Sequence, residues 1–91
     1  MSTTVRIPTQ LRTLTDGADQ VTARGVTIAE LIVDLESAHP GIRQRLLDKE
    51  GKLRRFVNLY VGDEDVRLLK GLDTPVPEGT EVLIIPAVAG G

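Results

Sequence analysis

Two short stretches near the N-terminus alternate between polar and apolar residues. They cover residues 4–8 and residues 20–24, and a period of two is typical of a strand that buries one face. An Asp-Gly pair at residues 16–17 supplies turn residues between them, so the pattern predicts a hairpin with a long loop. Leu11 and Leu14 lie in that loop, where we expect them to cover the edge of the core.

A helical period follows over residues 27–38. Thr27 precedes Glu30 by three residues, which is the spacing of a capping box, in which each side chain accepts a hydrogen bond from a backbone amide at the start of the helix. Pro40 and Gly41 then end the helix. Apolar residues recur at the i, i+3, i+4 and i+7 positions of one helical stripe; they are Ile28, Leu31, Ile32 and Leu35.

Two later stretches have the composition of strands. Residues 56–61 are rich in β-branched and aromatic types, and residues 80–85 end in a continuous apolar run that Pro86 stops. Such a run indicates that neither face of the strand is freely solvated, or that one face is a contact surface. Between these strands, residues 62–65 predict a polar turn and residues 66–68 a short return strand.

The predicted order is strand, strand, helix, strand, short strand, strand. One helix cannot cover both faces of a sheet, so the economical arrangement is a mixed sheet of about four to five strands with one main helix across one face. This is the α+β architecture known as the β-grasp, or ubiquitin-like, fold. We expect it to occupy residues 1–86, with residues 87–91 as a flexible C-terminal tail that ends in Gly-Gly. The helix stripe should pack against four sheet residues, which are Val5, Ile7, Val82 and Ile84.

The composition narrows the class of function. The chain has 91 residues, of which 41% are hydrophobic and 26% charged, the balance of one small folded domain. It lacks cysteine and has one histidine, which excludes disulfides, thiolate nucleophiles and cysteine-based metal sites. The acidic residues 63–65 are interpreted as an exposed turn, because adjacent carboxylates do not converge on one ion without further ligands. No run approaches the roughly 18 apolar residues of a membrane span, and the N-terminus lacks a secretory apolar region. We therefore expect a cytoplasmic binding or carrier protein with no catalytic residues, no bound metal and no membrane.

The net charge of −2 conceals a basic middle segment. Residues 43–59 hold six basic and two acidic side chains, whereas residues 60–91 hold two basic and six acidic. After a short helical turn at residues 42–47, the basic segment is interpreted as a solvated charged loop. The alternatives are docking to an acidic partner protein and binding to nucleic acid. Nucleic acid is the weakest of the three, because single-strand binders interleave aromatic residues for base stacking and only Phe56 borders the run.

The C-terminus carries the most informative pattern. Pro86 is followed by five small residues, Ala87, Val88, Ala89, Gly90 and Gly91. They have little to bury, and in extended form they reach about 17 Å beyond the strand. The two glycines lack Cβ atoms, so the end of the chain can thread a narrow channel and adopt the backbone angles that an enzyme imposes. The group that reaches the end of such a channel is the terminal carboxylate of Gly91.

Residues 78–91, with the sequence EGTEVLIIPAVAGG, resemble the C-terminal signature of the ThiS/MoaD family of ubiquitin-like sulfur carriers. Within that family, residues 55–67 and the ending PAVAGG are most similar to the carriers of an actinobacterial route to cysteine. The resemblance spans nearly the whole chain and is weakest in the loops at residues 9–20 and 41–54. Gly62 departs from the asparagine that usually follows this strand, which affects the turn and not the tail.

The resemblance implies that the chain is a carrier and not an enzyme. An E1-like adenylating and sulfurtransferase enzyme would join the Gly91 carboxylate to the α-phosphate of ATP, and a sulfur donor on that enzyme would displace AMP to give a C-terminal thiocarboxylate. In the cysteine route, the thiocarboxylate attacks an aminoacrylate on a pyridoxal-phosphate-dependent synthase, and after an acyl shift a metalloprotease releases cysteine. The carrier itself binds no cofactor.

The same tail has other uses, which the sequence leaves open. Carriers of this family also supply sulfur for molybdopterin, thiamine or sulfur-containing secondary metabolites. A ubiquitin-like protein modifier uses the same adenylate to form isopeptide bonds to lysine residues. In a β-grasp subunit such as the small subunit of molybdopterin synthase, the tail only inserts into a partner.

The last strand predicts a docking surface. If Val82 and Ile84 face the helix, a period of two turns Leu83 and Ile85 to the opposite face of the sheet. We expect an exposed apolar patch there, close to the tail, that docks the activating enzyme. Its expected neighbours are Val66, Arg6 and Arg67.

Overall fold

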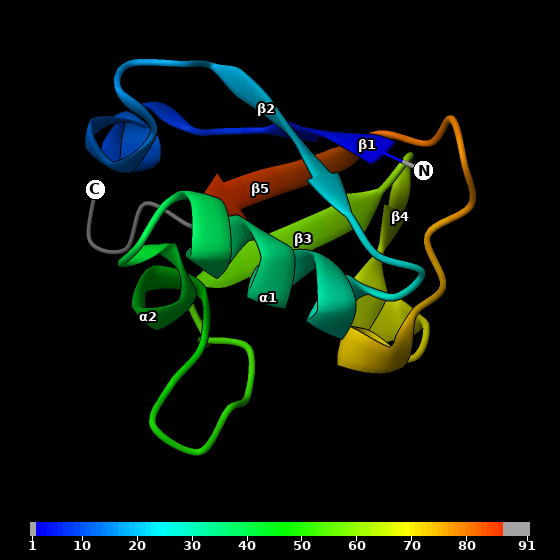
Figure 1. Cartoon of the computed structure of the whole chain (residues 1–91). Helices are drawn as coiled ribbons and strands as arrows, with labels where there is room; N and C mark the ends of the chain where they lie inside the picture. Colours follow the sequence, from blue (N-terminus) through cyan, green and yellow to red (C-terminus); the bar gives the residue numbers. More distant parts are fainter. Residues whose placement is uncertain (1, 87–91) are drawn as a thin grey trace.

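A computed structural model describes residues 2–86 and contains one five-stranded sheet in the order β2-β1-β5-β3-β4 (Figure 1). The strand β1 pairs parallel with β5, and the other neighbouring pairs are antiparallel. The sheet is therefore mixed, as the sequence predicts. The bounds of the strands are Ser2–Arg6 for β1, Gln20–Arg24 for β2, Val57–Val61 for β3, Glu64–Asp65 for β4 and Val82–Pro86 for β5.

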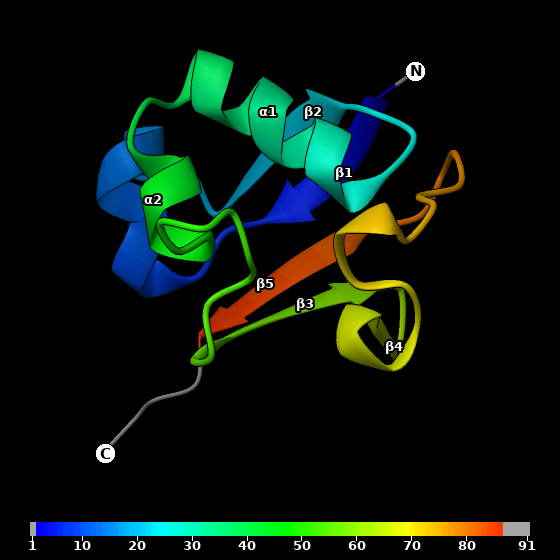
Figure 2. The same cartoon turned by 90° about the horizontal axis from the view of Figure 1, so that it is seen from below.

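The main helix α1, Ile28–Ala38, lies across one face of this sheet (Figures 1 and 2). Its first turn is capped much as the sequence predicts. The backbone amide of Glu30 donates to Thr27 Oγ1 at 3.3 Å, and Glu30 Oε1 accepts from the amide of Val26 at 3.0 Å. The glutamate thus reaches one residue further back than in an ideal capping box, and it fixes the chain as it enters the helix.

The apolar stripe of α1 forms the centre of the core. Its four residues and the four sheet residues expected opposite them are each at most 4% exposed. They belong to one hydrophobic cluster, which confirms the predicted helix face. Burial of each such aliphatic side chain contributes about 1.5–3 kcal/mol, so this contact supplies a large part of the stability of a small domain.

Two short helices, which contact each other, cover the same end of the core (Figure 1). The loop of the β1–β2 hairpin forms a 3-10 helix, η1 (Thr9–Thr15), which buries Leu11 and packs Leu14 against the core. The second α-helix, α2 (Ile42–Leu46), buries both of its terminal residues. Both elements lie where the sequence predicts a covered hairpin loop and a short helical turn.

Three predicted boundaries are wrong. The first strand was expected over residues 4–8, but β1 ends at Arg6. The return strand is β4, inside the predicted polar turn, while residues 66–68 form the 3-10 helix η2 (Val66–Leu68). The amide of Arg67 donates to Asp65 Oδ1 at 2.9 Å, so the aspartate caps a helical turn where a strand was expected. The strand β5 begins at Val82 and includes Pro86, which pairs with Val57. A further 3-10 turn, η3 (Gly71–Asp73), follows η2.

The arrangement is a β-grasp, with one main helix on one face of a mixed sheet. Among residues 2–86, no helix combines the length and the apolar character needed to span a membrane.

Candidate functional site

The root of the C-terminal tail lies at one end of β5. Pro86 is the last described residue and pairs with Val57 at the start of β3. Residues 87–91, which carry the predicted thiocarboxylate position Gly91 and the threading residues Gly90, Ala89, Val88 and Ala87, lie outside the described residues. Their roles stay predictions, and the structure locates only Pro86, the residue that precedes them.

The sheet face opposite α1 carries the predicted apolar patch. Val82 and Ile84 are 4% exposed in the core, whereas Ile85 is 43% exposed and Leu83 is half-buried. Because side chains alternate along a strand, Leu83 and Ile85 lie together on the helix-free face. The placement of these two residues confirms the predicted alternation.

Two polar residues of β3 complete this face. Tyr60 pairs with Leu83 and Asn58 pairs with Ile85, so both point to the same side as their partners. Neither residue was predicted for the patch, although both alternate with the buried Leu59 within one strand. The face therefore combines aliphatic, aromatic and amide groups within reach of the tail root.

The predicted arginines flank the patch on both sides. Arg6 lies opposite Leu83 on β1, and its Nε is 3.3 Å from Glu81 Oε2 in an ion pair between half-exposed side chains. On the other side, Arg67 donates from Nη1 to Asn58 Oδ1 and from Nη2 to the carbonyl oxygen of Arg54, both at 2.6 Å. Arg67 therefore ties η2 to β3 and to the loop that precedes β3.

Val66 does not belong to the patch. It is fully buried and part of the hydrophobic core cluster. The cause is the short length of β4: the chain leaves the sheet after Asp65, and the following 3-10 turn directs Val66 into the core. We therefore define the sheet patch as Leu83, Ile85, Tyr60, Asn58, Arg6 and Arg67.

The ionisable side chains of the described residues form no metal-binding cluster. Within residues 2–86, no group of three or more His, Cys, Asp or Glu side chains could hold a metal ion. Two carboxylates have a pKa below the usual range, and both act as caps for backbone amides. The amides of Arg43 and Gly41 lower the pKa of Glu36, and the amide of Lys52 lowers that of Asp48.

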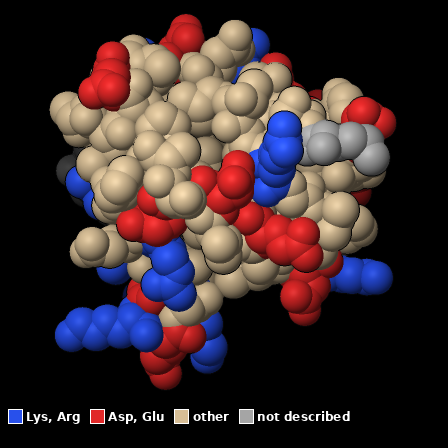
Figure 3. All heavy atoms as spheres, viewed as in Figure 1, with Lys and Arg blue, Asp and Glu red and all other residues tan. Residues whose placement is uncertain are grey.

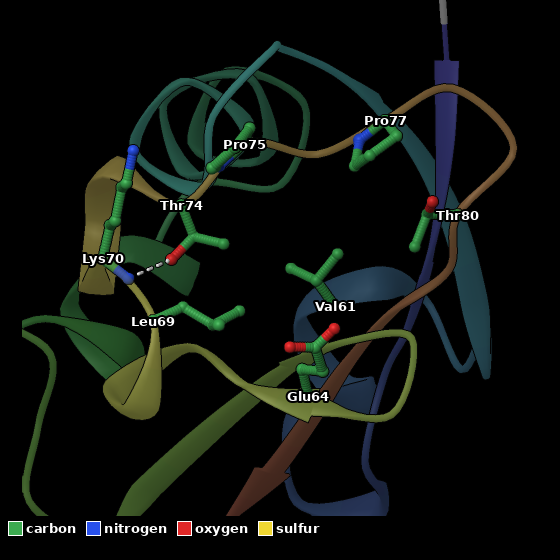
Figure 4. Close-up of a pocket in the computed structure, with 8 residues that line it drawn as sticks. All are labelled: Val61, Glu64, Leu69, Lys70, Thr74, Pro75, Pro77 and Thr80. Atoms are coloured by element: carbon green, nitrogen blue, oxygen red, sulfur yellow. Dashed lines mark hydrogen bonds between the residues drawn. The ribbon is translucent and has the colours of Figure 1, made fainter.

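An open groove of about 530 Å³ lies at the other end of the sheet (Figure 4). Val61 and Glu64 line one side of it, and Pro75 and Pro77 face them from the loop before β5. Val61 pairs with Val82, at the opposite end of β5 from Pro86. This groove is therefore separate from the root of the tail.

Comparison with known proteins assigns the fold and tail to a family. The model of the ThiS family matches residues 5–91 of this chain. The chain belongs to the ThiS family. The match includes the Gly-Gly end and all the strands of the sheet except the start of β1.

Two proteins that are similar over nearly the full length are named CysO. The sulfur carrier protein CysO of Mycobacterium tuberculosis is 53% identical over 93 aligned positions, which cover 100% of both chains. The CysO chain in the crystal structure of the Amycolatopsis orientalis BexX/CysO complex is 54% identical, with a TM-score of 0.92 over 98% of this chain and 99% of that one. This chain is accordingly a non-catalytic sulfur carrier of the ThiS family.

A more distant relative has a different name. Small archaeal modifier protein 3 of Haloferax volcanii is 31% identical over 65 residues, which are 71% of this chain and 70% of that protein. The BexX/CysO complex shows that a CysO protein assembles with a partner protein.

Proposed function

We propose that this ThiS-family carrier holds sulfur as a thiocarboxylate at Gly91 and delivers it to cysteine biosynthesis. The observation that carries the proposal is the full-length similarity to CysO sulfur carriers, which covers all 91 residues and so includes the Gly-Gly end. The sequence supports it, because five small residues that end in Gly-Gly follow directly after Pro86, the last residue of β5.

The tail must first be activated, because a carboxylate is a poor electrophile. In the proposed reaction, an oxygen of the Gly91 carboxylate attacks the α-phosphorus of ATP on an E1-like enzyme, and pyrophosphate leaves. Hydrosulfide supplied on that enzyme then attacks the acyl carbon, AMP leaves with the bonding electrons, and loss of the S–H proton gives the thiocarboxylate. In this proposal the activating enzyme consumes the ATP, the carrier binds no cofactor, and the carrier acts in the cytoplasm.

The thiocarboxylate is then an anionic sulfur nucleophile on a protein handle. For cysteine, it adds to an aminoacrylate held by a pyridoxal-phosphate-dependent synthase, and an S-to-N acyl shift leaves cysteine linked to Gly91 through an amide. A metalloprotease hydrolyses that amide and regenerates the Gly91 carboxylate. The carrier needs no acid or base of its own in these steps.

The sheet patch is the surface that we propose for docking the activating enzyme. It lies on the face that α1 leaves uncovered, and Ile85 immediately precedes the tail root at Pro86. Apolar contacts from Leu83 and Ile85 would supply binding energy, while the flanking arginines would set orientation.

The experiment that tests the proposal changes the length and bulk of the tail. Deletion of Gly91 withdraws the carboxylate by about 3.5 Å, and a misplacement of about 1 Å can lower a rate 100-fold. Addition of one residue overshoots by a similar distance, and Gly90→Val adds bulk and restricts the backbone. We expect all three variants to fold normally but to lose ATP–pyrophosphate exchange with the purified activating enzyme.

Mass spectrometry of the intact carrier is the second measurement. The wild type should gain the mass of a sulfur-for-oxygen replacement, and the three variants should not. Val33→Ala, a change at an exposed position of α1, is the control that should behave as wild type. Thiocarboxylate formation on the Gly91 deletion at the wild-type rate would contradict the proposal.

A protein modifier is the second candidate function, favoured by the similarity to small archaeal modifier protein 3. Both functions use the same adenylate and differ in the acceptor, which is sulfur for a carrier and a lysine amine for a modifier. Lysine-linked adducts of the wild type in cell extract, absent for the Gly91 deletion, would establish modification. If a synthase uses the thiocarboxylate and no such adducts form, the protein acts as a sulfur carrier. If the sulfur instead reaches molybdopterin, thiamine or a sulfur-containing secondary metabolite, the carrier function stands and only the proposed cysteine pathway is wrong.

A further inference from the structure

We propose that residues 43–55 form a second docking surface, which binds an acidic region around the tail-binding site of the activating enzyme. We call this surface the basic rim, and it rests on the proposed function because it accompanies the entry of the tail. We choose the activating enzyme as the partner, because both the carrier function and the modifier function begin with it. The basic rim comprises Arg43, Arg45, Lys49, Lys52, Arg54 and Arg55, all of which are exposed.

The basic rim lies at the same end of the sheet as the tail root. The amide of Val57 donates to the carbonyl oxygen of Arg54 at 3.1 Å, and Val57 pairs with Pro86. Figure 2 shows the loop after α2 returning to the end of β5. Any protein that receives the tail therefore approaches the basic rim as well.

No cation of the basic rim lies at ion-pair distance from a carboxylate in the described structure, although Asp48 attracts Lys52 and Arg54 at longer range and Glu36 attracts Arg43. Across residues 2–86, the one ion pair joins Arg6 and Glu81. Asp48 accepts from the amides of Glu50 and Lys52 at 2.8 and 3.0 Å, so this carboxylate caps its own loop. Cations with no carboxylate at ion-pair distance are free to pair with a partner.

The carboxylate of Glu36, next to the basic rim, is occupied in the same way. It accepts from the amides of Gly41 and Arg43 at 2.9 to 3.2 Å, and these bonds lower its pKa. It is therefore ionised at neutral pH, but its oxygens accept hydrogen bonds from backbone amides of the turn between α1 and α2.

The backbone of the basic rim is held in place, which limits the entropy lost on binding. Arg54 donates from Nε to the carbonyl oxygen of Gln44 at 2.7 Å, and the backbone amide of Arg54 donates to the carbonyl oxygen of Leu46 at 2.9 Å. Leu47 and Leu53 form a β-bridge that closes the loop, and Leu53 packs against the core.

The distribution of charge over the molecule favours an acidic protein as the occupant. Figure 3 shows Lys and Arg side chains over the loop that follows α2, with acidic residues gathered elsewhere on the same face and beside that loop. Asp63 and Glu64 lie beyond β3 at the far end of the sheet from Pro86. A partner that is acidic around its tail-binding site would therefore attract the tail end of the carrier and repel the other end.

A nucleic acid fits this surface less well. One exposed aromatic residue, Phe56 at 54% exposure, borders the basic rim, whereas single-strand binders stack successive bases on several aromatic side chains. The net charge of −2 for the whole chain would also oppose a long polyanion. Binding of nucleic acid is therefore the alternative that the experiment below must distinguish.

The test is a charge reversal with a matched control. Lys49→Glu/Lys52→Glu changes two exposed side chains of the basic rim that make no hydrogen bond through Nζ in the described structure. Arg24→Glu/Lys70→Glu makes the same change in net charge away from the tail root, since Arg24 pairs with Ser2 and Lys70 lines the far groove. ATP–pyrophosphate exchange by the purified activating enzyme is measured against carrier concentration at low and high salt, and melting curves verify that both variants fold.

We expect the basic-rim variant to raise the KM for the carrier about tenfold at low salt with kcat unchanged, because steering charges act on encounter. High salt should reduce the difference, and the control should match the wild type. Equal KM values for the two variants would overturn the proposal that the basic rim binds the activating enzyme. Binding of a single-stranded oligonucleotide that only the basic-rim variant loses, with KM unchanged, would overturn it in favour of nucleic acid. Absence of exchange with the wild type would instead refute the proposed function, and the inference with it.

Discussion

At the scale of single residues, Gly25 shows how a close backbone approach shapes this fold. It lies between β2 and α1, where a Cβ atom would be 2.7 Å from the backbone nitrogen of Leu31 and 2.9 Å from the carbonyl carbon of Glu30. These are backbone atoms of the first turns of α1, so they cannot move aside as a flexible side chain would. The absence of a side chain at Gly25 therefore allows the backbone between β2 and α1 to pass this close to the helix.

Gly25→Ala should lower the free energy of unfolding by about 1–3 kcal/mol, because the added methyl group forces the backbone to shift. Thermal or denaturant unfolding measures the change. Gly79→Ala is the control: Gly79 has a φ of +85° but nothing within 4 Å of an added Cβ, so its substitution adds only conformational strain, about 1 kcal/mol. A Gly25 variant no less stable than the Gly79 variant would show that the contact relaxes easily.

Residue-level features were predictable where they depend on neighbours in the sequence. The cap formed by Thr27 and Glu30 follows from their spacing and is present. The contacts of Arg67 with Asn58 and Arg54 span 9 and 13 residues, and no local pattern encodes them. The close approach at Gly25 likewise depends on how β2 and α1 pack.

At the scale of elements, α1 has one buried and one exposed face. Leu31 is 1% exposed, whereas Val33 on the same helix is 66% exposed. Leu31→Ala should lower the free energy of unfolding by about 2–5 kcal/mol, because it removes buried methyl groups and leaves a cavity. Val33→Ala should change it by less than about 0.5 kcal/mol. Urea unfolding of both variants checks this, and an unchanged midpoint for Leu31→Ala would show that the helix face is misassigned.

Elements were predictable in proportion to the length of their pattern. The helix period over α1 and the strand patterns of β1, β2, β3 and β5 identify the main elements and the order of the fold. Residues 66–68 were predicted as a strand but form η2, because three residues hold too few positions to distinguish a period of two from a 3-10 turn. The outcome there depends on Asp65, which caps η2 and sends Val66 into the core.

At the scale of the whole molecule, the two faces of the sheet have different roles. One face is covered by α1 and forms the core, while the other presents the sheet patch beside the tail root. The basic rim lies at the same end, and the groove near Glu64 at the opposite end. The sequence predicted the uncovered face from strand alternation, but the position of the basic segment beside Pro86 follows only from the pairing of Val57 with Pro86.

A substitution at one exposed position can test whether the sheet patch contributes to binding without changing the stability of the fold. Ile85 is 43% exposed, so Ile85→Asp places the new carboxylate in water and should leave the fold intact. It should weaken the complex with the activating enzyme at least about tenfold, because it removes an apolar contact and adds a charge that loses its hydration on docking. Isothermal titration with the purified enzyme measures the Kd.

Val33→Asp is the matched control for that measurement. Val33 is 66% exposed on α1, on the side of the molecule away from the sheet patch, so the same new charge should leave the Kd unchanged. Melting curves of both variants should overlap with the wild type, which separates a lost contact from a lost fold. If Ile85→Asp binds as tightly as Val33→Asp, the helix-free face is not part of the complex, and the carrier must dock through the tail and the basic rim alone.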